Sequence, residues 1–240
     1  GGIDSSVTVT LAAEALGCDR VSGLVLPAAG TPHRDVDDAI RLAEELVVDY
    51  HVLDLQPIVD RFLAVLLDET GAVRDAGTRT AVGSADTLQR ERGNLAARAR
   101  MATAYFEANR TNRLVLGTGN RTELALGYFT KYGDGGVDAL PLGDLYKTQV
   151  RDLARVLDVP ETIVEKPPTA GLWEGQTDEA ELGAPYPLVD AILEQLLDRD
   201  RDVDETAAVL GLERDRVATV ATRVATNAHK RAVPPAPGDR

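Results

Sequence analysis

Apolar residues recur at helical spacing near the start of the chain, which predicts a first helix over residues 5–16. Gly17 follows directly, and a glycine at this position is a common helix stop. Residues 20–27 form an apolar run that predicts a buried strand. A second, amphipathic helix is expected over 35–48, with an apolar face made by Ile40, Leu42, Ala43, Leu46 and Val47.

Predicted strands and helices continue to alternate through the middle of the chain. Residues 50–55 alternate as a strand, Pro57 suits a first helical turn, and the helix then continues to residue 67. A polar, glycine-containing stretch over 71–84 is predicted to be a mobile loop. It is followed by a long helix over 85–109 and a short buried strand over 113–117. Strands that alternate with helices predict an α/β fold with a doubly wound parallel sheet, Rossmann-like in type. Such sheets bind ligands beyond the carboxyl ends of their strands.

From residue 190 onward the pattern is entirely helical, with helices expected over 191–197, 203–210 and 214–230. The middle pair has the spacing of a DNA-binding helix-turn-helix, but its second helix carries Asp215 and few basic residues before Arg223. A packed helical appendage over 190–231 is therefore the better interpretation. We expect one domain over 1–240, a disordered tail over 232–240, and a first strand that precedes Gly1 and is missing from this sequence.

Charge and composition narrow the function classes. The 240 residues carry a formal net charge of −13, which argues against non-specific nucleic-acid binding. No apolar run approaches the roughly 20 residues of a membrane span, and no signal segment is visible, so a cytoplasmic protein without a membrane partner is expected. The single cysteine excludes an internal disulfide. The acidic surface is typical of a halophilic protein, because high salt screens self-repulsion.

Lysine is scarce, and its few positions are informative. The four lysines are Lys131, Lys147, Lys166 and Lys230, and all other basic residues except histidine are arginine. Lys131 and Lys147 fall in polar, glycine-rich segments and not on solvated helix faces, which makes both candidates for function.

The first residues have the features of an anion site. Gly1 and Gly2 allow backbone N–H groups to approach an anion, and the helix that follows adds unsatisfied donors and the positive end of its dipole. Ser5 adds a hydroxyl. Asp4 beside a phosphate is unfavourable unless a cation lies between them, so it suggests Mg²⁺. A glycine turn followed by an ordinary helix cap would explain the same residues without a ligand.

Three further segments carry candidate chemistry. Small polar residues over 118–122 follow the predicted strand at 113–117, and Glu123 could be a second metal carboxylate or simply a helix-start glutamate. Aromatic residues among glycines over 127–138 suit an aromatic, phosphorylated ligand, although a surface loop with an aromatic anchor would look the same. Lys147 at a helix start is unfavourable for the dipole unless an anion is bound there. Residues 167–173 read as an active-site lid or a packed surface loop.

Together these segments resemble the ammonia-dependent NAD synthetases of the N-type ATP pyrophosphatase superfamily, whose folds are of the adenine nucleotide alpha hydrolase type. The resemblance spans nearly the whole chain, and its most specific stretch is Phe-Thr-Lys-Tyr-Gly-Asp-Gly-Gly at 129–136. The family's Gly-Thr-Asp-His is here Gly-Thr-Gly-Asn at 117–120, so the resemblance gives no role to Gly119 or Asn120.

The resemblance implies a reaction and a set of roles. ATP would adenylate deamido-NAD⁺, ammonia would displace AMP to give NAD⁺, and a homodimer would share the substrate site. Lys147 and Asp4 would be catalytic, and Asp4 and Glu123 would hold Mg²⁺. ATP would contact Gly1, Gly2, Ser5, Thr118, Lys147 and Thr169. Deamido-NAD⁺ would contact Arg98, Lys131, Asp138, His229 and Lys230.

Two alternatives remain open at this stage. Another adenylating amidotransferase or thiolating enzyme of the superfamily would share the glycine loop, although the acidic surface speaks against a tRNA substrate. A nucleotide-binding regulatory module without turnover would share it as well. Ammonia is the expected nitrogen source, because the chain has no room for a glutaminase domain.

Overall fold

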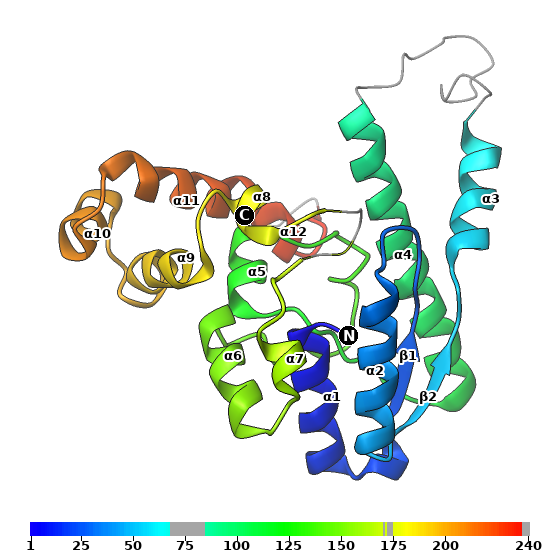
Figure 1. The fold of residues 1–240 in the computed structure, drawn as a ribbon. Coiled ribbons are helices and arrows are strands. Elements are labelled where there is room, and N and C mark those ends of the chain that lie inside the picture. The colour runs from blue at the N-terminus through cyan, green and yellow to red at the C-terminus, as the bar shows by residue number, and fades with distance from the viewer. Residues whose placement is uncertain (68–84, 170, 172–174, 237–240) are drawn as a thin grey trace.

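The computed structural model describes residues 1–67, 85–169, 171 and 175–236. Figure 1 shows two strands surrounded by helices, with the C-terminal helices extending to one side. In chain order the elements are α1 (Ile3–Leu16), η1 (Cys18–Arg20), β1 (Ser22–Val25), α2 (His33–Glu45), β2 (Asp49–Val52), α3 (Gln56–Leu66), α4 (Ala85–Thr111), α5 (Arg121–Leu126), α6 (Lys147–Val156), α7 (Glu161–Val164), α8 (Asp178–Leu182), α9 (Tyr186–Leu193), η2 (Glu194–Asp198), α10 (Val203–Leu210), α11 (Arg214–Thr226) and α12 (Ala228–Arg231).

The predicted α/β alternation with parallel strands is confirmed. Strands β1 and β2 pair in parallel, with Ser22 opposite Asp49 and Val25 opposite Val52. Helix α2 connects them and packs against both strands, as expected of a parallel crossover unit. Helix α1 ends where Gly17 adopts a φ of 93°, a backbone conformation that glycine reaches without steric cost.

Two local predictions were wrong. The segment 113–117 is no regular strand: it makes a single parallel bridge between Leu116 and Ala139, and Leu114 is 74% exposed. The expected apolar face of the second helix also included Val47, but α2 ends at Glu45. Val47 takes a positive φ of 55° in the turn that follows and is 75% exposed, whereas Leu42 and Ala43 are buried as predicted.

The C-terminal helices pack against the rest of the chain through their own apolar cluster. Buried side chains from α9, α10 and α11 meet those of α5 and Tyr146 in this cluster. A second cluster joins α1, α2, α6 and α7, and a third lies between α3 and α4. Helix α5 and the start of α6 therefore lie where the helical part meets the remainder of the molecule.

Three sequence predictions concern segments that lie wholly or partly outside the described residues. The stretch 71–84 and part of the predicted lid at 167–173 lie outside the described residues. Residues 232–236 contain no helix or strand, and the last four residues of the predicted tail are not described. Among the described helices, none is long and apolar enough to cross a bilayer.

Candidate active site

Lys147 is the first residue of α6, and neighbouring side chains fix that helix start. The backbone N–H of Lys147 donates to Thr122 Oγ1 at 2.9 Å, and the Thr122 hydroxyl donates to Asp190 Oδ1. The other Asp190 oxygen accepts the N–H of Thr148 at 2.9 Å. A buried carboxylate thus satisfies the positive end of the α6 dipole, which removes the electrostatic objection to a lysine there without invoking a bound anion.

The ammonium of Lys147 joins two carboxylates from distant parts of the sequence. Its Nζ donates to Asp4 Oδ2 on α1 and lies 3.4 Å from Glu123 Oε1 on α5. Only 6% of the Lys147 side chain is exposed, so these charges interact in a largely water-excluded setting. The structure therefore brings together Asp4, Glu123 and Lys147, which the sequence analysis assigned to one centre.

Asn120 ties the two carboxylates to the backbone. Its side-chain oxygen accepts the N–H of Glu123 at 3.0 Å, and its own N–H donates to Glu123 Oε2, which completes a capping box at the start of α5. The Asn120 amide nitrogen donates to Asp4 Oδ1 at 2.9 Å. Asn120 is fully buried and orients both acids, a role that the sequence analysis missed although the Asn-x-x-Glu spacing signals it.

The ionisation of the centre reflects burial and crowding of like charge. Burial, and after it the charge of Asp4, raise the pKa of Glu123 to about 8, while Lys147 acts in the opposite direction. Burial lowers the pKa of Lys147, but Asp4 and Glu123 outweigh that effect and hold it above its usual value. The ammonium therefore stays charged at neutral pH, while Glu123 largely keeps its proton until the pH passes about 8.

The centre opens into a cleft of about 1640 Å³ that also collects the other predicted ATP residues. Gly1 closely approaches α2: a Cβ there would lie 1.7 Å from the carbonyl oxygen of Asp35, so no larger residue fits. Ser5 donates to the carbonyl of Gly2 at 2.9 Å. The cleft is lined by Gly1, Gly2, Asp4, Ser5, Thr118, Glu123, Lys147 and Thr169, among others.

A layer of tyrosines lies beside Lys147. The ring centroid of Tyr186 is 5.3 Å from the ammonium, within the range of a cation–π contact. Its hydroxyl donates to Asp178 at 2.7 Å, and Tyr128 lies 3.1 Å from the other Asp178 oxygen. The N–H of Asp178 in turn donates to the carbonyl of Pro168, which connects this layer to the segment carrying Thr169.

Four of the predicted substrate residues are basic, and hydrogen bonds link three of them to one another. Arg98 donates to the carbonyl of Lys131 at 3.3 Å, and Lys131 donates to the carbonyl of His229. Lys230 donates to the carbonyls of Gly127 and Phe129, so it holds the glycine-aromatic segment in place. Of these four, Lys230 lines the cleft, and Arg98, Lys131 and His229 lie outside it.

Asp138 is separate from these basic residues. One of its oxygens accepts the N–H of Val115 at 2.8 Å, and the other accepts the hydroxyl of Tyr105 at 3.0 Å. These contacts pin the segment 113–117 to α4. Asp138 therefore has a local structural task, and its predicted contact with deamido-NAD⁺ stays a prediction.

These features define an α/β protein with a candidate nucleotide site that joins a glycine-led helix to a lysine and two carboxylates. A family model for NAD synthase matches residues 1–234, so the chain belongs to the NAD synthase family, as its resemblance indicated. It is 46% identical to the NH(3)-dependent NAD(+) synthetase of Methanosarcina mazei, covering 99% of this chain and 87% of that protein. The corresponding protein of Halobacterium salinarum is 44% identical, with 99% and 82% covered.

Two solved structures are similar to this chain, one an NMN synthetase and the other an NAD synthetase. The NMN synthetase from Francisella tularensis superposes with a TM-score of 0.79 at 34% identity, covering 99% of this chain and 86% of that one. The NH3-dependent NAD synthetase from Campylobacter jejuni, solved in complex with a nitrate ion, has a TM-score of 0.74 at 28% identity, with 98% and 85% covered.

Proposed function

We propose that this protein is an ammonia-dependent ligase that converts deamido-NAD⁺ to NAD⁺ while ATP is cleaved to AMP and pyrophosphate. One observation carries the proposal: Lys147 bridges Asp4 and Glu123 at the head of a glycine-led helix, in a cleft large enough for nucleotides. Membership of the NAD synthase family and the names of the relatives support the same reaction. The proposed fold is the doubly wound sheet typical of such nucleotide-binding proteins.

The ATP phosphates would lie over Gly1 and Gly2 at the start of α1, where backbone donors and the helix dipole favour anions. Ser5, Thr118 and Thr169 line the same cleft and offer hydroxyl groups to the nucleotide. Lys147 would then offset the negative charge of the phosphates as the reaction proceeds.

Asp4 and Glu123 suit Mg²⁺ by their chemistry. Magnesium prefers oxygen ligands and is commonly held by one or two carboxylates together with water and phosphate oxygens. Both carboxylates already face one positive charge, that of Lys147. A bound Mg²⁺ would supply further neutralisation of the phosphates.

The chemistry follows from these positions. The nicotinate carboxylate attacks the α-phosphorus of ATP, a new oxygen–phosphorus bond forms, and pyrophosphate leaves. Ammonia then attacks the acyl carbon, AMP leaves with the bonding electrons, and the nitrogen gives up one proton to yield the amide. Arg98, Lys131, Asp138, His229 and Lys230 are the proposed contacts for deamido-NAD⁺.

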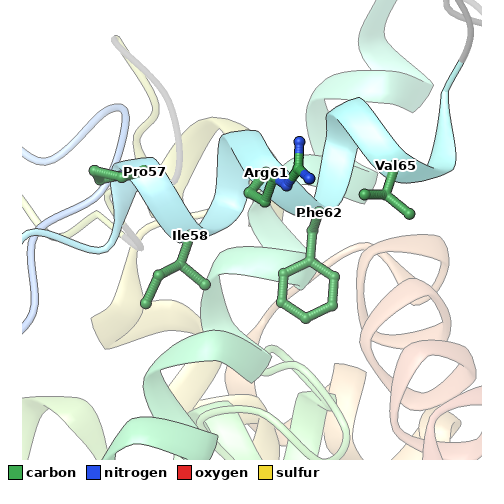
Figure 2. Close-up of a pocket in the computed structure, with 5 residues that line it drawn as sticks. All are labelled: Pro57, Ile58, Arg61, Phe62 and Val65. Carbon is green, nitrogen blue, oxygen red and sulfur yellow. The ribbon is translucent and has the colours of Figure 1, made fainter.

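We also propose that two copies of the chain form a homodimer through α3. Ile58, Phe62 and Val65 are 45%, 51% and 58% exposed, and with Pro57 and Arg61 they line an apolar groove of about 490 Å³ (Figure 2). Helix α3 packs against α4, which carries Arg98. An α3 interface would therefore bring the partner subunit near the proposed deamido-NAD⁺ residues.

The test combines deamido-NAD⁺, Mg-ATP and an ammonium salt, and measures NAD⁺, AMP and pyrophosphate. We expect equal amounts of the three products, and no turnover when glutamine replaces ammonium. Pyrophosphate release without any amide product would support a different adenylating enzyme. Nucleotide binding with no pyrophosphate release under any condition would support the regulatory module instead.

The assay should also be run with nicotinate mononucleotide in place of deamido-NAD⁺, because one structural neighbour is an NMN synthetase. We expect a higher kcat/KM with deamido-NAD⁺. A preference for the mononucleotide would overturn the proposed substrate and leave the ligase chemistry in place.

A further inference from the structure

Lys166 is the one lysine of the four that has no part in the proposed reaction. It follows α7 and precedes Thr169 by three residues, so it lies at the base of the segment proposed to contact ATP. Its side chain is 10% exposed. A lysine this buried needs charged or polar partners, because an unpaired ammonium would lose most of its hydration free energy.

All three N–H bonds of the Lys166 ammonium have a partner. It donates to Asp35 Oδ1 at 2.8 Å and to Asp38 Oδ2 at 2.6 Å, both on α2. The third acceptor is the carbonyl oxygen of Gly1, at 2.9 Å. An ammonium has three donors, so none remains for a phosphate. The two aspartates also neutralise its charge, which excludes Lys166 as a direct phosphate ligand in this arrangement.

The contact with Gly1 fixes the direction of the next backbone N–H. In a planar trans peptide the C=O and the following N–H point in opposite directions. Because Lys166 holds the Gly1 carbonyl on one side, the N–H of Gly2 must face the other side. No atom would lie within 4 Å of a Cβ on Gly2, so the space on that side of Gly2 is open, whereas Gly1 is pressed against Asp35. The Lys166 contacts thus hold the first peptide between α2 and the cleft.

We infer that Lys166 is a positioning residue that presents the Gly2 N–H to the ATP phosphates by holding the Gly1 carbonyl against Asp35 and Asp38. The inference rests on the proposed function, since it requires ATP to bind over these glycines. Lys166 acts on the phosphates beyond the α-position through the backbone, and it leaves the adenosine part of the nucleotide unaffected.

The test compares ATP with AMP, which lacks the β- and γ-phosphates, by isothermal titration calorimetry. Removal of Lys166 alone would leave two aspartates that repel phosphate, so the informative variant is Lys166→Met combined with Asp38→Asn, which keeps the local net charge unchanged. We expect ATP to bind about ten-fold more weakly to this variant, the loss typical of a hydrogen bond with a charged partner. AMP affinity should stay within about two-fold of wild type. Unchanged ATP affinity, or an equal loss for AMP, would overturn the inference.

Two single variants keep the question answerable if the double variant fails to fold. Asp38→Asn should weaken ATP binding about three-fold relative to Asp37→Asn, since Asp37 is exposed on the same helix. A purely electrostatic role of Asp38 predicts the opposite change in ATP affinity, because loss of a nearby negative charge favours phosphate binding. Equal or tighter ATP binding by Asp38→Asn would therefore contradict the positioning role of Lys166. Failure of the wild-type protein to bind ATP would instead count against the proposed function.

Discussion

At the scale of single residues, Lys147 has the most constrained environment in the site. It is buried between Asp4 and Glu123, and the ring of Tyr186 covers its ammonium group on another side. Two carboxylates facing one ammonium carry a surplus of negative charge when both are ionised. Because the pKa of Glu123 is about 8, this acid keeps its proton near neutral pH while Lys147 is the cation beside it. A Mg²⁺ ion at the proposed site would favour loss of that proton.

Replacement of Lys147 by methionine tests this balance. Lys147→Met leaves Asp4 and Glu123 without their shared counter-charge, and we expect a loss of about 3–5 kcal/mol in the free energy of unfolding, as for other broken buried ion pairs. Turnover should fall at least about hundred-fold, because the charge that offsets the phosphates is lost. Thermal melting and kcat measure the two effects, with Arg155→Met as the control at an exposed cation. Near-normal turnover would remove Lys147 from the mechanism.

The raised pKa of Glu123 gives a pH dependence of stability. The pKa of this acid rises from 4.5 to about 8 on folding, mainly because of burial, so the folded state retains a proton that the unfolded state has lost. Stability from this group is thus full below about pH 4.5 and declines as the pH rises through about 8. In chelator-treated buffer, the melting temperature of wild type should fall over this range relative to Glu123→Gln. Parallel curves for the two proteins would refute the assignment.

Single residues also show how far the sequence alone could lead. The glycine opening, Asp4, Glu123 and Lys147 have recognisable patterns, and the structure brings them together. Asn120 and Lys166 were missed as members of the site. The Asn-x-x-Glu spacing signals the cap that Asn120 makes at the start of α5. No local pattern reports the contacts of Asn120 with Asp4 and of Lys166 with Gly1, because these partners lie more than 100 residues away.

At the scale of elements, the start of α6 determines where Lys147 points. Asp190 on α9 accepts hydrogen bonds from Thr148 and Thr122, so a helix of the C-terminal part holds the segment that carries Lys147 in place. The C-terminal helices are in this sense a support for the site.

Asp190→Ala tests this support. It leaves a buried backbone N–H and a buried hydroxyl without their acceptor, and we expect destabilisation by about 2–3 kcal/mol. The melting temperature should fall by about 4–12 °C, the usual scale for a chain of this length. Asp204→Ala on α10, at an exposed carboxylate, is the matched control. Equal melting temperatures for the two variants would show that Asp190 does not anchor α6.

Helices were predicted more accurately than strands, for a physical reason. A helix satisfies its backbone within one segment, so residues 56–66 and 203–210 form helices close to the predicted limits. A strand requires a partner of matching register from elsewhere in the chain. Residues 113–117 have the apolar composition of a strand but pair with residue 139 at only one bridge, so they stay irregular.

At the scale of the whole molecule, the apolar groove on α3 predicts self-association. Phe62→Glu should yield a monomer, because a charge cannot be buried at an apolar interface without a partner. Analytical ultracentrifugation measures the association. The KM for deamido-NAD⁺ should rise at least about ten-fold, with ATP binding within about two-fold of wild type. Val209→Glu, at a position of α10 that is 56% exposed, is the control. A wild-type protein that is monomeric at assay concentration would refute the interface.

The net charge of −13 predicts a second property of the whole protein. Mutual repulsion among acidic groups acts over about 10 Å at 0.1 M salt and only about 3 Å at 1 M. The melting temperature should therefore rise steadily between 0.1 and about 2 M KCl. Greatest stability at the lowest salt concentration would contradict the prediction that the protein is adapted to high salt.

The sequence distance between the partners of the charged centre has a consequence for synthesis. Asp4 meets Asn120 and Lys147, which follow it by 116 and 143 residues. On a ribosome, the carboxylate of Asp4 therefore has no lysine partner until Lys147 has been synthesised. A nascent fragment that stops short of α6 lacks Lys147, so the charged centre can form only after the segment that carries α6 has been synthesised.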